Sequence, residues 1–139
     1  MTTAQQNKAL IRAVFDDLSA GRTAALPEAM SDDVRWTFAG NWSWSGTWSL
    51  KPTVLHQLLG PLMAQFDGGY RIHADLIIAE DDRVVVQAQG NGTTVEGDPY
   101  NQTYCFIFTL ADGRITEVIE HCDTALVERV LRPLTPVNP

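Results

Sequence analysis

The chain is poor in the features that mark membrane and secreted proteins. Its apolar runs all stop short of the roughly 20 residues that a membrane-spanning helix needs. Residues 1–15, "MTTAQQNKALIRAVF", lack the basic start and the continuous apolar stretch of a signal peptide. We therefore expect a cytoplasmic protein without a membrane partner.

Positive charge is also scarce. Ten Lys and Arg residues stand against 17 Asp and Glu residues, which gives a formal net charge of -7 and a pI near 4.7. Nucleic acids and anionic membranes both favour clustered Lys and Arg. This balance argues against either as a partner.

The chain has only two cysteines, Cys105 and Cys122. A disulfide between them is one option, but a reducing cytoplasm and the strand pairing predicted below oppose it. Neither has a second Cys or a His at metal-ligand spacing, and His121 points to the opposite face of a strand from Cys122. We predict no metal site.

What remains is typical of one globular domain. The 139 residues are 45% hydrophobic and 19% charged, enough for a real core. We treat 1–139 as a single domain, in which the tail 132–139, "RPLTPVNP", is loose.

Hydrophobic spacing predicts an α+β fold. The helix and strand signals follow one another as a run of helices and then a run of strands, which favours helices packed on one face of a curved, mainly antiparallel sheet. Thr2 or Thr3 can cap the first helix, Gly21 ends it, and Asp123 can cap the last one. The predicted helices are 4–20, 24–30, 51–66 and 124–131, and the predicted strands are 33–38, 70–79, 83–94, 99–110 and 114–122. Residues 39–50 are predicted to be a loop.

The turn "ADG" sets the partners of Glu120, a carboxylate inside an apolar run. A three-residue loop ending in Gly113 with positive φ pairs Tyr104 with Glu120 and Gln102 with Cys122. We favour this register. A two-residue Asp-Gly loop pairs Tyr104 with His121 instead.

The turn "VEGDP" extends the comparison to a third strand. It places Asn91 opposite Tyr104, Gln89 opposite Phe106, and Gln87 opposite Phe108. One face of the sheet then carries amides, aromatic rings and one acid, with Phe106 facing Val118. The reverse face is predicted to be apolar and to need cover, for instance from a second subunit; it carries Val84, Val86, Ala88, Ile107, Ile115 and Ile119.

Two interpretations of Glu120 follow. A lone Glu in a strand most often faces solvent. Tyr104 and Phe106, however, are unusual on a wet face. A carboxyl enclosed by them would have a raised pKa and could act as a general acid or base, with Tyr104 donating to an oxyanion.

The remaining candidates are histidines and tryptophans. We place His56 on a helix rim, His73 on an exposed strand face, and His121 beside Ile119, from where the alternative register would bring it into the pocket. Trp36 is expected in the core. The other three, Trp42, Trp44 and Trp48, either cover a pocket mouth or pack their loop on the sheet edge.

The element order and the stretch "YNQTYCFIFTLADGRITEVIEHCDTALVERVL" resemble the SnoaL-like branch of the nuclear-transport-factor-2-like superfamily, over nearly the whole chain. The resemblance implies a cone-shaped fold whose apolar pocket binds small hydrophobic molecules. It further implies no metal or organic cofactor, and often a dimer. Polyketide cyclases, ketosteroid isomerase and limonene-epoxide hydrolase are relatives.

The chain departs from the best-known sites of that superfamily. Phe38 stands where ketosteroid isomerase has its basic Asp, and Tyr104 or Cys105 falls near its oxyanion-stabilising Asp. Gln87 and Gln89 stand where the epoxide hydrolase has an Arg-x-Asp pair, while Glu120 matches its last acid.

Three hypotheses follow. The first is a cofactor-free isomerase, cyclase or lyase acting on a carbonyl compound, with Glu120 as the proton shuttle and Tyr104 as the oxyanion donor. The second is a non-catalytic ligand-binding or dimerisation module, and the third, weaker, is an epoxide hydrolase. The residues predicted to contact the ligand are Asn91, Gln89, Gln87, Gln102, Phe106, Val118, Trp36, Phe38 and His121.

Overall fold

The computed structural model describes residues 3–134. Its first element, α1 (Ala4–Ser19), begins at a capping box. The Thr3 hydroxyl accepts a hydrogen bond from the backbone N–H of Gln6, and the Gln6 side chain accepts one from the backbone N–H of Thr3. Gly21, just beyond the helix, has a φ of 90°, where glycine is unstrained. The buried stripe of α1 packs on the sheet and consists of Ile11, Val14, Phe15 and Leu18.

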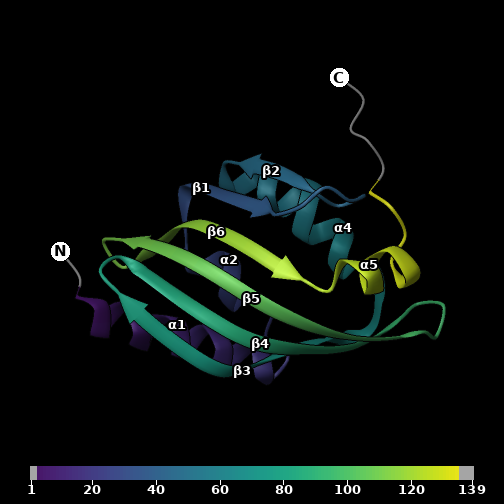
Figure 1. The fold of residues 1–139 in the computed structure, drawn as a ribbon, viewed down its shortest axis with the longest axis horizontal. Helices are drawn as coiled ribbons and strands as arrows, with labels where there is room; N and C mark the ends of the chain where they lie inside the picture. The colour runs from purple at the N-terminus through teal and green to yellow at the C-terminus, as the bar shows by residue number, and fades with distance from the viewer. Residues whose placement is uncertain (1–2, 135–139) are drawn as a thin grey trace.

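One sheet holds all six strands, in the order β2-β1-β6-β5-β4-β3. Only the β1–β6 pair is parallel. The strands are β1 (Met30–Phe38), β2 (Gly46–Ser49), β3 (Phe66–Glu80), β4 (Arg83–Thr94), β5 (Pro99–Ala111) and β6 (Arg114–Cys122). Figure 1 shows α1 and α2 (Ala25–Glu28) behind this curved sheet. The predicted α+β class is confirmed.

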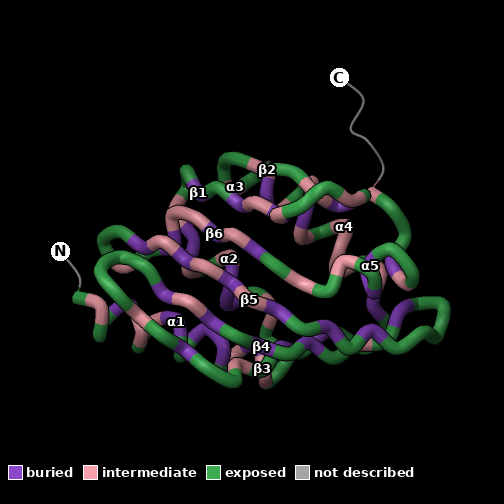
Figure 2. The backbone as a smooth tube through the Cα atoms, viewed as in Figure 1, coloured by how far each residue is buried: buried purple, intermediate pink, exposed green. Residues whose placement is uncertain are grey.

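The strand ends differ from the predictions in two places. β1 begins three residues earlier than expected, at Met30, and β3 begins at Phe66 rather than at residue 70. The predicted loop 39–50 contains a short strand, β2, because Trp48 pairs with Trp36 of β1. Buried and exposed residues alternate along the long strands, as Figure 2 shows.

The helix predicted over 51–66 is broken into three pieces. They are α3 (Lys51–Thr53), a π-helical segment η1 (Val54–Leu59) and α4 (Gly60–Met63). The backbone N–H of Gly60 donates to the carbonyl of Leu55, a bond between residues five apart, and Pro61 has no N–H to continue an α-helical ladder. The helix therefore widens at this point instead of running straight.

The β5–β6 hairpin corrects the favoured register. Asp112 and Gly113 both have positive φ and form a two-residue loop. A bulge at Thr116 then adds one residue to β6, so that Glu120 pairs with Phe106 and Cys122 pairs with Tyr104. Neither predicted register is right. The bulge nevertheless returns Glu120 to the face that carries Tyr104.

The β4–β5 register is also wrong in the prediction. Thr93 pairs with Pro99, and a short loop closes through hydrogen bonds of Thr94 with Asp98 and Gly97. This pairing brings Ala88, not an amide, opposite Tyr104. Gln87, Gln89 and Asn91 therefore lie exposed on the opposite face of the sheet.

The predicted apolar reverse face is partly wrong for the same reason. Four of its six members lie buried under the helices, and Ile107 and Ile119 remain on the outer face. The four buried members are Val84, Val86, Ala88 and Ile115. A one-residue slip in register exchanges the two faces of a strand, which accounts for the error.

The C-terminal part is better held than predicted. α5 (Thr124–Val130) is capped by the Asp123 side chain, as expected. Arg132 is tied to Gln65 through its backbone N–H and to Trp44 through its carbonyl, so the predicted loose tail does not begin there. Residues 135–139 of that tail lie outside the described residues.

Cys105 and Cys122 are free thiols, as predicted. They point to opposite faces of the sheet, Cys105 outward beside His121. Within residues 3–134, the helices are all too short or too polar to cross a membrane.

Candidate active site

A pocket of about 270 Å³ opens between the helices and the inner face of the sheet. Its upper wall is apolar and comes from η1 and α4: Leu55, Leu59, Leu62 and Met63. Leu18, Leu26 and Pro27 form the opposite wall. No Lys, Arg or His lines this pocket among the residues that the structure describes, so a neutral ligand suits it better than an anion.

Glu120 is the one carboxylate in the described lining of this pocket. Its residue is only 5% exposed, between Phe38 of β1 and Phe106 of β5. Burial raises the pKa of Glu120 well above its ordinary value, and the nearby indole of Trp36 only partly opposes that rise. Burial thus favours the protonated, neutral form of Glu120.

Two tyrosine hydroxyls meet beside this acid. The oxygens of Tyr70 and Tyr104 are 2.6 Å apart, a short hydrogen bond in which either can donate. Burial is the main cause that raises the pKa of Tyr104 well above its usual value, and charge on Glu120 adds to it. Both hydroxyls therefore keep their protons, and the one that accepts within the pair can still donate its own.

Two glycines of β4 make room for Tyr70. A methyl group at Gly90 would lie 1.9 Å from the Tyr70 hydroxyl, and one at Gly92 would lie 2.5 Å from the Tyr70 ring. Each of these distances is below any normal contact. The position of the tyrosine pair thus depends on the absence of side chains on the neighbouring strand.

Four predicted site residues come together in this pocket: Glu120, Tyr104, Phe106 and Trp36. The rings of Tyr104 and Phe106 stack with centroids 4.8 Å apart and form an aromatic floor. Whether these residues act on a ligand stays a prediction.

Other predicted contacts lie next to the pocket but do not line it. Val118 is fully buried in the core. Phe38 lines a small cavity of about 10 Å³ that also touches Glu120. Gln102 is 1% exposed, and its amide is occupied by Tyr100 and by the backbone of Asp123, so it holds the strand end rather than a ligand.

Four predicted contacts are wrong in placement. Gln87, Gln89, Asn91 and His121 are exposed on the outer face of the sheet. Gln89 donates there to Asp75 at 3.0 Å, and Asn91 donates to Asn101 at 3.4 Å. They cannot reach the pocket through the sheet.

The sequence reasoning missed Tyr70, Ile72 and the two glycines. Tyr70 was assigned only as the start of a strand. The Gly-x-Gly spacing in "QGNGTT" was the available signal, because a glycine inside a strand often marks the close approach of another group.

The arrangement can perform proton transfer at one end of an apolar ligand. A protonated carboxyl can donate to a carbonyl oxygen, and a hydrogen-bonded phenol pair can stabilise negative charge. The thiol of Cys122 is less suited to attack, because burial and the nearby acid raise its pKa to about 12.

Several solved structures share this fold. A protein described as an isomerase from Bacillus subtilis superposes with a TM-score of 0.78 at 16% identity, over 97% of this chain and 100% of that one. A protein described as a SnoaL-like polyketide cyclase from Jannaschia sp. CCS1 gives 0.73 at 20% identity, over 94% and 95%. TerC, co-crystallised with polyporic acid, gives 0.74 at 22% identity, over 90% and 97%. At these identities the likeness concerns the fold alone.

Curated proteins give no significant match to this chain. The SnoaL-like domain family, by contrast, matches residues 11–118, which include the C-terminal half of α1, most of the pocket lining and the sheet up to Val118. The inferred resemblance is thereby confirmed, and the NTF2-like fold agrees with it. The chain belongs to the SnoaL-like domain family.

Proposed function

We propose that this protein binds a small, mainly apolar carbonyl compound and catalyses its isomerisation, cyclisation or elimination by proton transfer through Glu120. The observation that carries the proposal is the burial of this single acid at the base of an apolar pocket. The names of the fold relatives, an isomerase and a polyketide cyclase, agree with such chemistry.

The proposed reaction begins with a protonated Glu120. It donates its proton to the carbonyl oxygen of the ligand, while the Tyr70–Tyr104 pair supplies a further hydrogen bond to the same oxygen. The resulting carboxylate then accepts a proton from a carbon next to the carbonyl. The electrons of the broken C–H bond form the double bond of a neutral enol. In an isomerisation, Glu120 then gives its proton to a different carbon and takes back the proton on the enol oxygen, so the carbonyl and the protonated enzyme are both restored.

The pocket also suggests the shape of the ligand. Tyr104 and Phe106 provide a nearly flat aromatic floor, with 22° between the ring planes. The opposite wall consists of flexible aliphatic side chains. A planar or ring-containing compound with one polar end fits this combination, because its face can stack on the rings while its carbonyl reaches Glu120.

The second candidate function is non-catalytic binding of the same ligand class. It is favoured by the lack of a second acid or a histidine in the described lining of the pocket, since many acid–base enzymes use two such groups. Epoxide hydrolysis has less support: Gln87 and Gln89, at the expected positions of its Arg-x-Asp pair, face away from the pocket.

The test is a panel of cyclic enones, aromatic ketones and linear polyketide-like diketones, assayed for binding and for conversion. Glu120→Gln keeps the shape and removes the proton, and we expect a loss of turnover of at least about 100-fold with ligand affinity largely retained. Asp16→Asn, an exposed acid on α1 outside the pocket and the outer face of the sheet, is the control and should behave as the wild type. Conversion that survives Glu120→Gln would contradict the assignment, and tight binding without turnover in the wild type would favour the binding module.

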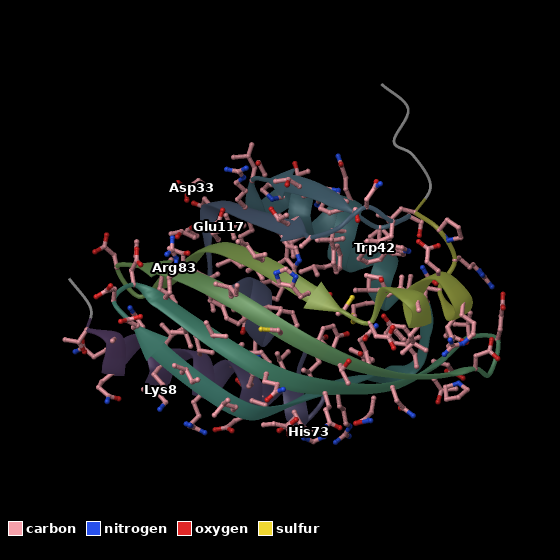
Figure 3. The ribbon with its side chains drawn as sticks, in the orientation of Figure 1. Lys8, Asp33, Trp42, His73, Arg83 and Glu117 are labelled. Carbon is pink, nitrogen blue, oxygen red and sulfur yellow. The ribbon has the colours of Figure 1, made fainter. Side chains whose placement is uncertain are left out.

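We also propose that two copies associate through the outer face of the sheet. A row of apolar side chains crosses it at matching register: Ile78, Val85, Ile107 and Ile119. The next row carries both signs of charge, Glu80, Arg83, Glu117 and Arg35, and Figure 3 labels Arg83 and Glu117 near one end of the sheet. A two-fold arrangement lets such mixed rows pair with themselves. The proposed occupant of this face is therefore a second copy of the chain.

A further inference from the structure

The indole N–H of Trp36 is a buried donor without an acceptor among the described residues. Trp36 is 2% exposed and lines the pocket. Two other tryptophans are satisfied: the N–H of Trp42 donates to the carbonyl of Ala39 at 2.8 Å, and that of Trp44 donates to the carbonyl of Arg132 at 3.2 Å. A buried donor left unpaired is costly and calls for an explanation.

Trp36 lies next to the one acid of the pocket. It precedes Phe38 by two residues on β1, on the same face, and Phe38 pairs with Glu120 of the parallel strand β6. On the other side of Glu120, Tyr70 and Tyr104 share one hydrogen bond and the Tyr100 oxygen accepts from Gln102, so each of these hydroxyls already has a partner, whereas the indole N–H of Trp36 has none. Besides these tyrosines, the thiol of Cys122 is close enough for the charge on Glu120 to raise its pKa.

A carboxylate at Glu120 therefore has no cation to balance it within the described lining of the pocket. It needs at least one donor when it has lost its proton. The indole N–H of Trp36 is a nearby donor that is buried without an acceptor, so a bond to this carboxylate would satisfy both groups.

We infer that Trp36 is the positioning residue for the ionised form of Glu120. Its indole N–H stays unpaired while Glu120 is protonated and donates to the carboxylate after Glu120 has given its proton to the ligand. The transfer of the proton from Glu120 to a ligand rests on the proposed function, whereas the bond from Trp36 to an ionised Glu120 does not. The step balances: the O–H bond of Glu120 breaks, an O–H bond forms on the ligand, and the carboxylate keeps the electron pair.

A neutral donor suits this role better than a cation. A Lys or Arg at the same place would hold Glu120 ionised at all times and would remove the acid from the resting site. An indole stabilises the carboxylate by a hydrogen bond and leaves the protonated form accessible. In agreement, the nearby Trp36 indole lowers the pKa of Glu120 against the larger, raising effect of burial.

The first test needs no ligand. The indole N–H resonances of ¹⁵N-labelled protein are followed by NMR from pH 5 to pH 10, together with the side-chain carboxyl signals of ¹³C-labelled Glu. We expect the Trp36 resonance to move downfield as Glu120 ionises, and to stay constant in Glu120→Gln. A Trp36 signal that does not move while Glu120 titrates would overturn the inference.

The second test uses Trp36→Phe, with Trp48→Phe as the matched control. Trp48 is the cross-strand partner of Trp36 but does not line the pocket. In Trp36→Phe we expect the midpoint of the Glu120 titration to rise. With a converted ligand, we expect kcat to fall about tenfold with little change in KM, because the lost donor acts on a charged form only. Trp48→Phe should change neither quantity.

The outcomes separate the two proposals. If the wild type neither binds nor converts a carbonyl compound, the proposed function fails, while the ligand-free titration still decides the role of Trp36. If Trp36→Phe keeps both the midpoint and kcat of the wild type, the inference fails and the proposed function stands. Should Trp36→Phe not fold, the wild-type titration alone gives the answer.

Discussion

The acidity of Glu120 is a property of its surroundings rather than of the residue. A Glu at the same place in an isolated strand would ionise near its ordinary pKa. Packing against Phe106 and Trp36 removes water from the carboxyl, so the neutral form is favoured. The free energy of unfolding should therefore depend on the protonation of Glu120, which can be measured without a substrate.

We predict that Glu120 makes the protein less stable as pH rises, and that Glu120→Gln removes this dependence. Because the pKa of Glu120 is raised in the folded state, the folded protein holds a proton that the unfolded chain has lost above about pH 4.3. The free energy of unfolding then falls with increasing pH until the folded pKa is passed. The contribution of this one group is at most about 1.4 kcal/mol per pH unit.

Urea unfolding at pH 5, 6, 7 and 8 measures the effect. As the pH rises over this range, the free energy of unfolding of Glu120→Gln should increase relative to that of the wild type. Asp16→Asn, an exposed acid on α1, provides the control for the loss of one carboxylate. Parallel curves for the wild type and Glu120→Gln would contradict the raised pKa.

The tyrosine pair yields a prediction at the same scale. Tyr70→Phe and Tyr104→Phe each leave one buried hydroxyl without its partner, so we expect each to lower the free energy of unfolding by about 1–2 kcal/mol. The double variant should lose less than the two single losses combined, because the second change leaves no unpaired group behind. Strictly additive losses in a double-mutant cycle would argue against a shared hydrogen bond.

At the scale of elements, the break in the middle helix builds the upper wall of the pocket. The wider π-helical turn of η1 presents Leu55 and Leu59 to the cavity, and Gly60 permits it. A methyl group at Gly60 would lie 2.8 Å from the carbonyl oxygen of Leu55. A side chain there cannot be accommodated without moving the backbone.

Gly60→Ala should therefore be destabilising, although alanine favours helices by up to about 1 kcal/mol over glycine. We expect a net loss of about 1–2 kcal/mol in the free energy of unfolding and weaker ligand binding, since Leu55 and Leu59 shift. The measurement is chemical denaturation together with ligand titration, and His56→Ala, exposed on the same segment, is the control. A stabilised Gly60→Ala would show that helix propensity outweighs the contact.

At the scale of the whole molecule, the two faces of the sheet have different roles. The inner face holds the core and the pocket. The outer face keeps a half-buried apolar row, including Ile107 and Ile119, bordered by polar side chains. Such a pattern is typical of an interface core with a polar rim.

We predict that the wild type is a dimer in solution and that Ile107→Lys shifts it to monomer. The substituted side chain points away from the core of its own chain, so the fold should survive, while two buried ammonium groups would oppose association. Light scattering coupled to size-exclusion chromatography measures the mass, and Gln5→Lys on the exposed side of α1 is the control. A wild type that is monomeric at every concentration would rule out the interface.

Much of this architecture follows from local patterns. Residues that are neighbours in the chain determine three of its features. They are the alternation of buried and exposed residues in β4, β5 and β6, the helix caps at Thr3 and Asp123, and the turn at Asp112 and Gly113. The same holds for Glu120, an acid within an apolar run that lies next to an aromatic strand. Local patterns suffice here because alternation and capping depend on side chains only a few positions apart.

Only the tertiary structure decided which residues surround Glu120. The bulge at Thr116 adds a single residue, and with a side-chain period of two that residue determines which face of β6 looks into the pocket. The pairing of β4 with β5 likewise sent Gln87 and Gln89 outward, and the pairing of β3 with β4 brought Gly90 under the hydroxyl of Tyr70. Short-range patterns do not encode such choices, because strand register is set by packing across the sheet between residues far apart in the chain.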